Sequence, residues 1–192
     1  MLPEAPESLR IAARIGGRLT CASALEHDGL WTPRARGTQR PLVHIALRPN
    51  AHHREAGVRA HWSSVIPVAE RDLFDPVENV LACVASCFEE EQGFAVWESA
   101  VRRKHVTVAG VKRTKWGSLA ARRLADEVGD RSDSGVESTF VYRCRRSGIP
   151  CLQQVEIDGH HVDVLIGRRL VVQIDGFEFH KDAPPAAGRH RT

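Results

Sequence analysis

The sequence predicts an α+β (α/β) fold, with a mixed, largely helical N-terminal region followed by one helix and a three-stranded meander. Two observations lead to this prediction. Apolar residues recur at helical spacing through most of residues 75–147, and from Cys151 onwards they alternate as they do in β-strands. The length of 192 residues, with 42% hydrophobic residues, is sufficient for a sizeable core.

The first third of the chain predicts short elements of both kinds. Leu9 to Ile15 has helical spacing and is followed by two glycines, which favour a helix end. A second short helix is expected over residues 21–27. Residues 41–48 alternate as a strand, and residues 57–62 are expected to pair with it across a polar loop.

The middle of the chain predicts a group of amphipathic helices. Asp75 and Pro76 are typical of an N-cap and a first helical residue. Helical spacing then covers VENVLACVASC, FAVWESAVRR and SLAARRLADEV. The polar, glycine-bounded stretch 129–135 is the expected linker. We therefore expect an N-terminal region over residues 1–130 (1–72 mixed α/β, 73–130 helical), a smaller domain over 131–180 and a disordered tail over 181–192.

After the linker, a helix over residues 135–147 and three strands (CLQQVEI, HHVDVLIG and RLVVQID) are expected, with Asp158-Gly159 as a hairpin turn. The register of the last hairpin follows from its pattern, because a slip of one residue would reverse every side chain. With Ile166 opposite Leu170, one face is uniformly apolar. The other face then has Asp163 opposite Gln173 and His161 opposite Asp175.

Two neighbouring carboxylates on a half-buried sheet face repel each other and lose hydration unless a cation lies between them. A hard divalent cation such as Mg²⁺ suits Asp163 and Asp175, because it prefers oxygen ligands and keeps several water molecules. The alternative is that this face is exposed to solvent, as polar faces of antiparallel sheets usually are.

The run SGVES, followed by VDVLIGRRLVVQIDGFEFH, resembles the PD-(D/E)XK, restriction-endonuclease-like nucleases. It is more closely similar to an uncharacterised bacterial family related to very-short-patch-repair endonucleases, whose pattern is a helix glutamate, then VD, then V-x-E-x-DG-x-x-x-H. The similarity covers about residues 131–180. The preceding region, with GGRLTCASALEHDGLW and PLVHIAL, is similar to AbiEi-type antitoxins.

This resemblance implies Mg²⁺-dependent or Mn²⁺-dependent hydrolysis of DNA, with the metal ion activating a bound water. It implies that Asp163 is a metal ligand and that Glu137 supports the metal site from its helix. It also implies that Asp175 and His180 belong to the active-site end of the last strand, with His180 as a general acid or base. Each residue has a simpler alternative: Ser134 and Glu137 form a capping box, Asp175 starts a turn, and His180 is a solvated loop residue.

The sequence departs from the family in two places. Gln173 replaces the family's glutamate, which removes one negative charge from the site and lowers its expected affinity for a divalent ion. The tail KDAPPAAGRHRT cannot supply the further helix and strand of the nuclease fold. We therefore expect a C-terminally truncated nuclease-like protein of weakened or lost activity, with an open strand edge that a homodimer would protect.

A DNA-binding or antitoxin-like regulator with a remnant nuclease module is the alternative function. Basic residues of the N-terminal region would then contact phosphates: Arg34, Arg36, Arg40 and Arg48. The formal net charge of +3 does not by itself require a nucleic-acid partner. The sequence has no basic start followed by an apolar run and no apolar segment of about 18 residues, so we expect a cytoplasmic protein without a membrane partner.

The cysteines and histidines do not predict a metal site by their spacing. The five cysteines are odd in number and contain no CxxC pair, so we expect reduced, mostly buried thiols. The spacing of His44, His52, His53 and His61 fits no metal motif, and we expect these histidines in a solvated loop or on a strand face.

Overall fold

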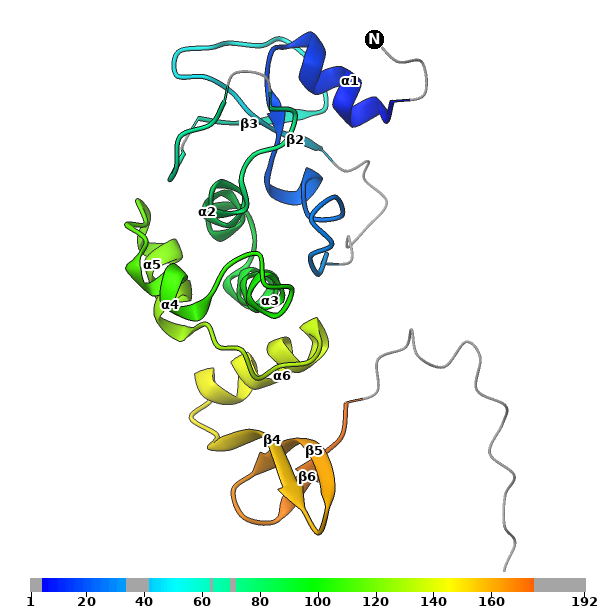
Figure 1. Ribbon diagram of the computed structural model, residues 1–192, viewed down its shortest axis with the longest axis vertical. Coiled ribbons are helices and arrows are strands. Elements are labelled where there is room, and N and C mark those ends of the chain that lie inside the picture. Colours follow the sequence, from blue (N-terminus) through cyan, green and yellow to red (C-terminus); the bar gives the residue numbers. More distant parts are fainter. Residues whose placement is uncertain (1–4, 34–41, 63, 70–71, 175–192) are drawn as a thin grey trace, which may run out of the picture.

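The computed structural model describes residues 5–33, 42–62, 64–69 and 72–174. Along its long axis, a small sheet, a group of helices and a second small sheet follow one another (Figure 1). This arrangement confirms the predicted α+β class. Within the described ranges, no helix is both long enough and apolar enough to cross a membrane.

The N-terminal sheet is formed by β1 (Arg18–Leu19), β2 (Val43–Ala46) and β3 (Val58–His61), with β2 in the centre. Strand β2 pairs antiparallel with β1 and parallel with β3. The predicted partnership of the two strands is therefore confirmed, although they are parallel and the polar loop between them crosses back rather than closing a hairpin. Helix α1 (Glu7–Arg14) packs on this sheet, and their shared core contains Ile11, Ala12, Leu19, Ile45 and Leu47.

The expected helix over residues 21–27 is shorter than predicted. Only the 3₁₀ helix η1 (Cys21–Ser23) forms, and turns follow it. Cys21 has a φ of +48°, in the left-handed region. This conformation lies outside the right-handed helical region, so an α-helix cannot include Cys21 as the prediction required.

The centre of the molecule contains four helices: α2 (Val77–Cys87), α3 (Glu90–Arg102), α4 (Val108–Arg113) and α5 (Leu119–Glu127). Their apolar faces enclose Phe94 and Trp97, which are fully buried. The indole N–H of Trp97 donates to the carbonyl of Leu81, 3.1 Å away, so its polar atom is satisfied inside the core. The three helices expected here are present, and α4 is an additional helix that the sequence pattern did not predict.

The start of α2 differs from the expected one. Pro76 is the N-cap residue and has no side chain that can cap the helix. Asp75 instead accepts a hydrogen bond from Nε of Arg18 at 2.8 Å, and its side chain is almost fully buried. This ion pair ties the start of α2 to β1, so the prediction that Asp75 caps the helix was wrong.

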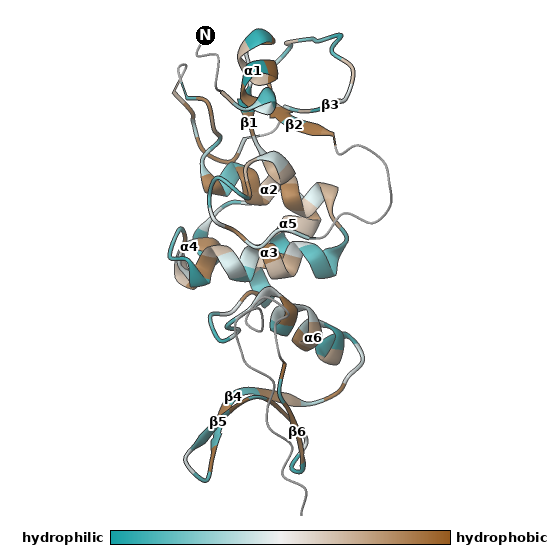
Figure 2. Ribbon diagram, turned by 90° about the vertical axis from the view of Figure 1, so that its right-hand side faces the viewer, coloured by the Kyte–Doolittle hydropathy of each residue, from teal (hydrophilic) through white to brown (hydrophobic). Residues whose placement is uncertain are grey.

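Helix α6 (Gly135–Arg146) packs against α3, and its Tyr142 joins the central core. The meander that follows consists of β4 (Cys151–Ile157), β5 (His160–Ile166) and β6 (Leu170–Val172), in this order. Figure 2 shows it as an arched sheet below α6.

The pairing of β5 with β6 has the predicted register. Ile166 lies opposite Leu170, and Val164 lies opposite Val172. Strand β6 ends at Val172, so the expected pair of Asp163 with Gln173 is not part of the ladder, and Asp175, expected opposite His161, lies outside the described residues. Val164 is fully buried, whereas Leu170 and Val171 on the edge strand are 57% and 45% exposed. The meander is therefore covered on part of its surface only.

Candidate functional site

Asp163 is held at the end of the meander where the nuclease site was predicted. It is half-buried on β5, and its Oδ2 accepts a hydrogen bond from the backbone N–H of Ile174, 2.6 Å away. This bond is charge-assisted and fixes the chain just beyond β6 against β5. Gln173, which directly precedes Ile174, is exposed. The structure thus places Asp163 beside the segment that contains Gln173.

Glu137 lies in the first turn of α6 and is 5% exposed. Its backbone N–H donates to Oγ of Ser134 at 3.1 Å, and the Ser134 hydroxyl donates to Oε1 of Glu137 at 2.9 Å. Oε2 accepts the backbone N–H of Asp133 at 2.9 Å. Glu137 therefore caps its own helix, as the capping box indicated, although it reaches Asp133 and not the N–H of Ser134.

Gln154 connects Glu137 with the strand that pairs with β5. Its side-chain amide donates to Oε2 of Glu137 at 3.2 Å. The ladder pairs Gln153 with Val164 and Val155 with Val162, so Gln154 is the residue across from Asp163. Gln154 has a φ of +50°, a conformation that is uncommon for a residue other than glycine. Gln154 therefore contacts Glu137 of α6 and lies across the ladder from Asp163 of β5.

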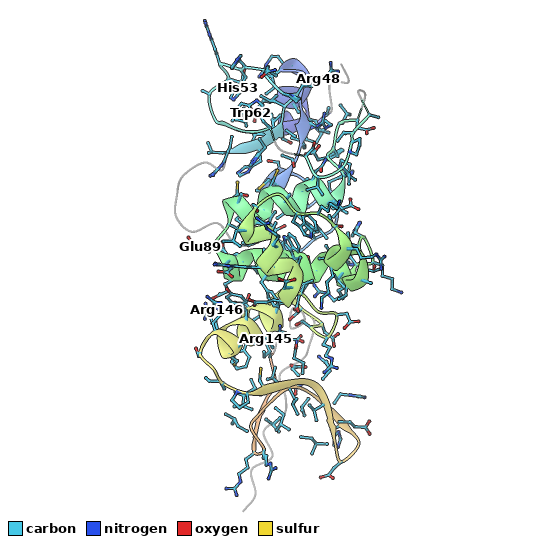
Figure 3. The ribbon with its side chains drawn as sticks, turned by 90° about the vertical axis from the view of Figure 1, so that its left-hand side faces the viewer. Arg48, His53, Trp62, Glu89, Arg145 and Arg146 are labelled. Carbon is cyan, nitrogen blue, oxygen red and sulfur yellow. The ribbon has the colours of Figure 1, made fainter. Side chains whose placement is uncertain are left out.

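Among the described residues, the other predicted site residues do not lie near Asp163. Asp175 and His180 lie outside the described residues, and so do Arg34, Arg36 and Arg40. Arg48 is exposed, two residues after the end of β2. Figure 3 labels it beside the N-terminal sheet, whereas Arg145 and Arg146 lie on α6, next to the meander. Arg48 and Asp163 are therefore at opposite ends of the molecule.

Among the described residues, no group of three or more acidic, cysteine or histidine side chains that could hold a metal ion includes Asp163. Oδ1 of Asp163 has no hydrogen-bond partner among the described residues, and the exposed Gln173 offers an amide oxygen. Both oxygens of Glu137 are already occupied by N–H and O–H donors. Mg²⁺ is commonly held by one or two carboxylates together with water molecules. Asp163 and Gln173 are thus the described residues that would hold it.

A second group of side chains, far from the meander in sequence, has the composition of a metal site. Cys21, His44, His61 and Cys87 each offer one ligand atom, and these atoms all lie within 4.8 Å of one another. All five cysteines are free, as expected. The expectation that His44 and His61 belong to no metal site was based on spacing alone, whereas the fold brings them together. Soft sulfur and imidazole ligands differ from the oxygen ligands expected at Asp163.

The four side chains of this Cys/His group interact directly. Nδ1 of His44 is 3.1 Å from Nε2 of His61, and Sγ of Cys87 is 3.8 Å from the same Nε2. A hydrogen bond with Cys21 holds the pKa of the Cys87 thiol well below its usual range, and His44 and His61 act in the same direction. The same bond to Cys87, together with burial, raises the pKa of the Cys21 thiol.

The pKa of His61, the histidine of β3, is also shifted from its usual value. Burial lowers the pKa of His61, but hydrogen bonds and charges from Cys83 and Cys87 outweigh burial and raise the pKa to about 9. A thiolate at Cys87 beside a protonated His61 is therefore the favoured charge state of this pair. Sequence reasoning missed this group because its members come from four separate elements.

No family model matches this chain, and neither a curated protein nor a solved structure is significantly similar to it.

Proposed function

We propose that the chain is a nuclease-like protein whose site, at the end of the β4–β6 meander, uses a divalent metal ion to hydrolyse phosphodiesters with reduced activity. The observation that supports this most is the placement of Asp163, which lies beside the chain segment of Gln173 and across from Gln154. The proposal extends the resemblance to restriction-endonuclease-like enzymes that the sequence alone indicates.

Each side chain has a distinct part in this proposal. Asp163 would bind the metal ion through Oδ1, while Oδ2 keeps the end of β6 in place. Gln173 would add a neutral oxygen from the exposed side. Glu137 would orient Gln154 across from Asp163, as a positioning residue rather than a ligand. A bound Mg²⁺ or Mn²⁺ would lower the pKa of a water molecule and neutralise charge on the phosphate.

The amide at position 173 explains why we propose reduced activity. A glutamate there would give the cation a second carboxylate, whereas Gln173 gives it an uncharged oxygen. Gln173 is exposed and has no hydrogen-bond partner among the described residues, so the change to glutamate would disturb no contact that holds the fold.

Cleavage of supercoiled plasmid with Mg²⁺ or Mn²⁺ tests the proposal, using the natural protein, Asp163→Ala and Gln173→Glu. We expect slow nicking by the natural protein and faster nicking by Gln173→Glu. Asp163→Ala should lose at least about 100-fold in rate, since changes even outside the first ligand shell cost about 10- to 100-fold in metal affinity or activity. Glu156→Ala, an exposed carboxylate on β4, is the matched control and should leave nicking unchanged.

Two outcomes would contradict the proposal. Nicking that persists in Asp163→Ala would place the activity elsewhere or in a contaminant. A complete lack of nicking by all variants, with circular dichroism showing folded proteins, would favour the regulator instead. DNA affinity that falls steeply with salt, without any cleavage, would then be expected.

A further inference from the structure

We propose that Cys21, His44, His61 and Cys87 bind one zinc ion, and that this ion fastens the N-terminal sheet to the helical core. The proposal is independent of the nuclease site, because it concerns different residues at the other end of the molecule.

The two histidines converge because of the register of the N-terminal sheet. His44 pairs with Arg59 and His61 pairs with Ala46 in the parallel β2–β3 ladder. Side chains two residues apart on paired strands point to the same face, so both imidazoles lie on one side of the sheet. Their ring nitrogens are 3.1 Å apart, and the ring centroids are 5.3 Å apart.

The two cysteines lie on either side of these strands in the sequence: Cys21 precedes β2, and Cys87 follows β3. Cys87 is the last residue of α2 and is half-buried. Cys21 is fully buried and opens η1 with a φ of +48°. A left-handed conformation costs a residue other than glycine about 1–2 kcal/mol, and such conformations concentrate at functional sites. The conformation of Cys21 is explained if its sulfur has to reach a metal ion that the other three side chains also bind.

The distances suit a tetrahedral ion. Zinc binds sulfur at about 2.3 Å and nitrogen at about 2.0–2.1 Å, so neighbouring ligand atoms lie about 3.3–3.8 Å apart. The His44–His61 and His61–Cys87 distances of 3.1 and 3.8 Å are close to this range. The largest separation within the group is 4.8 Å, which needs a contraction of about 1 Å. Rotation of the side chains would supply it without a change of fold.

The chemistry of the group selects zinc among common metals. Two thiols and two imidazoles form the Cys₂His₂ set of closed structural zinc sites. Mg²⁺ and Ca²⁺ require oxygen ligands, and iron–sulfur clusters are generally held by cysteines. A disulfide between Cys21 and Cys87 would leave the two imidazole nitrogens facing each other without a common partner.

The ion would join four separate segments of the chain. Its ligands belong to η1, to the two parallel strands and to the end of α2. With four protein ligands the site is closed, so its role would be structural and not catalytic. Binding energy of structural zinc contributes directly to folding.

Metal analysis of the purified full-length protein by mass spectrometry tests the proposal. We expect one zinc per chain in the natural protein and at least a tenfold lower content in His61→Ala and Cys87→Ala. Cys144→Ala is the matched control, because its thiol is buried in α6 and lies outside the group. Cys144→Ala should keep its zinc, with circular dichroism verifying that all variants fold.

Replacement of the metal by Co²⁺ in the natural protein keeps the test valid even if a ligand variant fails to fold. We expect intense visible absorption from a tetrahedral ion and near-ultraviolet bands from cobalt–thiolate bonds. Full-occupancy iron or copper, zinc retained in Cys87→Ala, or a protein mass about 2 Da lower because of a disulfide would each overturn the proposal. Zinc-free protein whose Co²⁺ spectrum is that of the hydrated ion would do the same.

Discussion

At the scale of single residues, Asp28 is a side chain whose charge the fold accommodates poorly. It lies in the turn after η1, is half-buried, and its Oδ2 has no hydrogen-bond partner. Burial raises the pKa of its carboxyl group, while His27 and His105 lower it by a smaller amount. The ionised form is therefore less stable in the folded protein than in the unfolded chain.

Asp28→Asn should stabilise the protein in a pH-dependent way. Because the folded pKa is raised, the protonated carboxyl contributes stability that is fully present below the unfolded pKa of about 3.9. This contribution is lost as the pH rises through the folded pKa. The amide introduced by the substitution does not ionise, so urea unfolding should show a gain over the natural protein at pH 7 that disappears below about pH 4.

The control for this measurement is Asp126→Asn, which removes an exposed carboxylate from α5. It should give no comparable gain at pH 7. A stability difference for Asp28→Asn that is the same at pH 4 and pH 7 would contradict the explanation by ionisation.

At the scale of elements, the turn between α1 and β1 depends on one glycine. A Cβ atom on Gly17 would clash with Cγ2 of Ile45 and would lie 2.8 Å from the carbonyl oxygen of Ala46. Both contacts belong to β2, the central strand of the sheet, and a backbone oxygen cannot move aside cheaply. Gly17 therefore allows the chain to cross β2 at close range.

Gly17→Ala should lower the free energy of unfolding by about 1–3 kcal/mol, the usual cost of overpacking a well-packed region. Thermal or urea unfolding measures this. Gly117→Ala is the control, because a Cβ there would have open space around it and its φ is not positive. A loss of the same size in both variants would mean that flexibility of the chain, and not the contact with β2, is responsible.

The elements of the C-terminal part were predictable to the level of register. The alternation of Val162, Val164 and Ile166 and the short turns leave one pairing that keeps the apolar side chains together, and the ladder has it. The parallel pairing of β2 with β3 was not predictable in this way. A polar loop of this length fits either a hairpin or a crossover, so the loop sequence does not decide between them.

The two candidate sites also differ in how far the sequence could predict them. Asp163 could be placed from sequence because its neighbours follow within one hairpin. The Cys/His group could not, since its members are separated by 17 residues between the histidines and by 26 between His61 and Cys87. No local spacing connects such residues, and the only signal in the sequence was the number of cysteines and histidines themselves.

At the scale of the whole molecule, Glu98 joins the central helices to the C-terminal part. This α3 residue is 2% exposed. Its Oε2 accepts the hydroxyl of Ser138 at 2.7 Å, and its Oε1 accepts the backbone N–H of Gly129 at 3.2 Å. One buried carboxylate therefore connects α3, α6 and the segment that precedes α6.

Glu98→Ala should lower the free energy of unfolding by about 2–4 kcal/mol, because the buried hydroxyl of Ser138 and the half-buried N–H of Gly129 each lose an acceptor and a buried side chain is truncated. Urea unfolding followed by both circular dichroism and tryptophan fluorescence measures the loss and shows whether the two probes still coincide. Asp126→Ala, with an exposed carboxylate, should stay within about 0.5 kcal/mol of the natural protein. A loss below about 1 kcal/mol for Glu98→Ala would show that this connection contributes little.

The two sheets also differ in how much of the chain must be synthesised before their strands can pair. In the meander each strand pairs with the next one along the sequence. In the N-terminal sheet, β1 pairs with β2, and Leu19 also forms a parallel bridge with Phe74. Because contacts between distant residues are slow to form, the meander can close as soon as its strands are made, whereas the bridge from β1 to Phe74 has to wait until more than fifty further residues have left the ribosome.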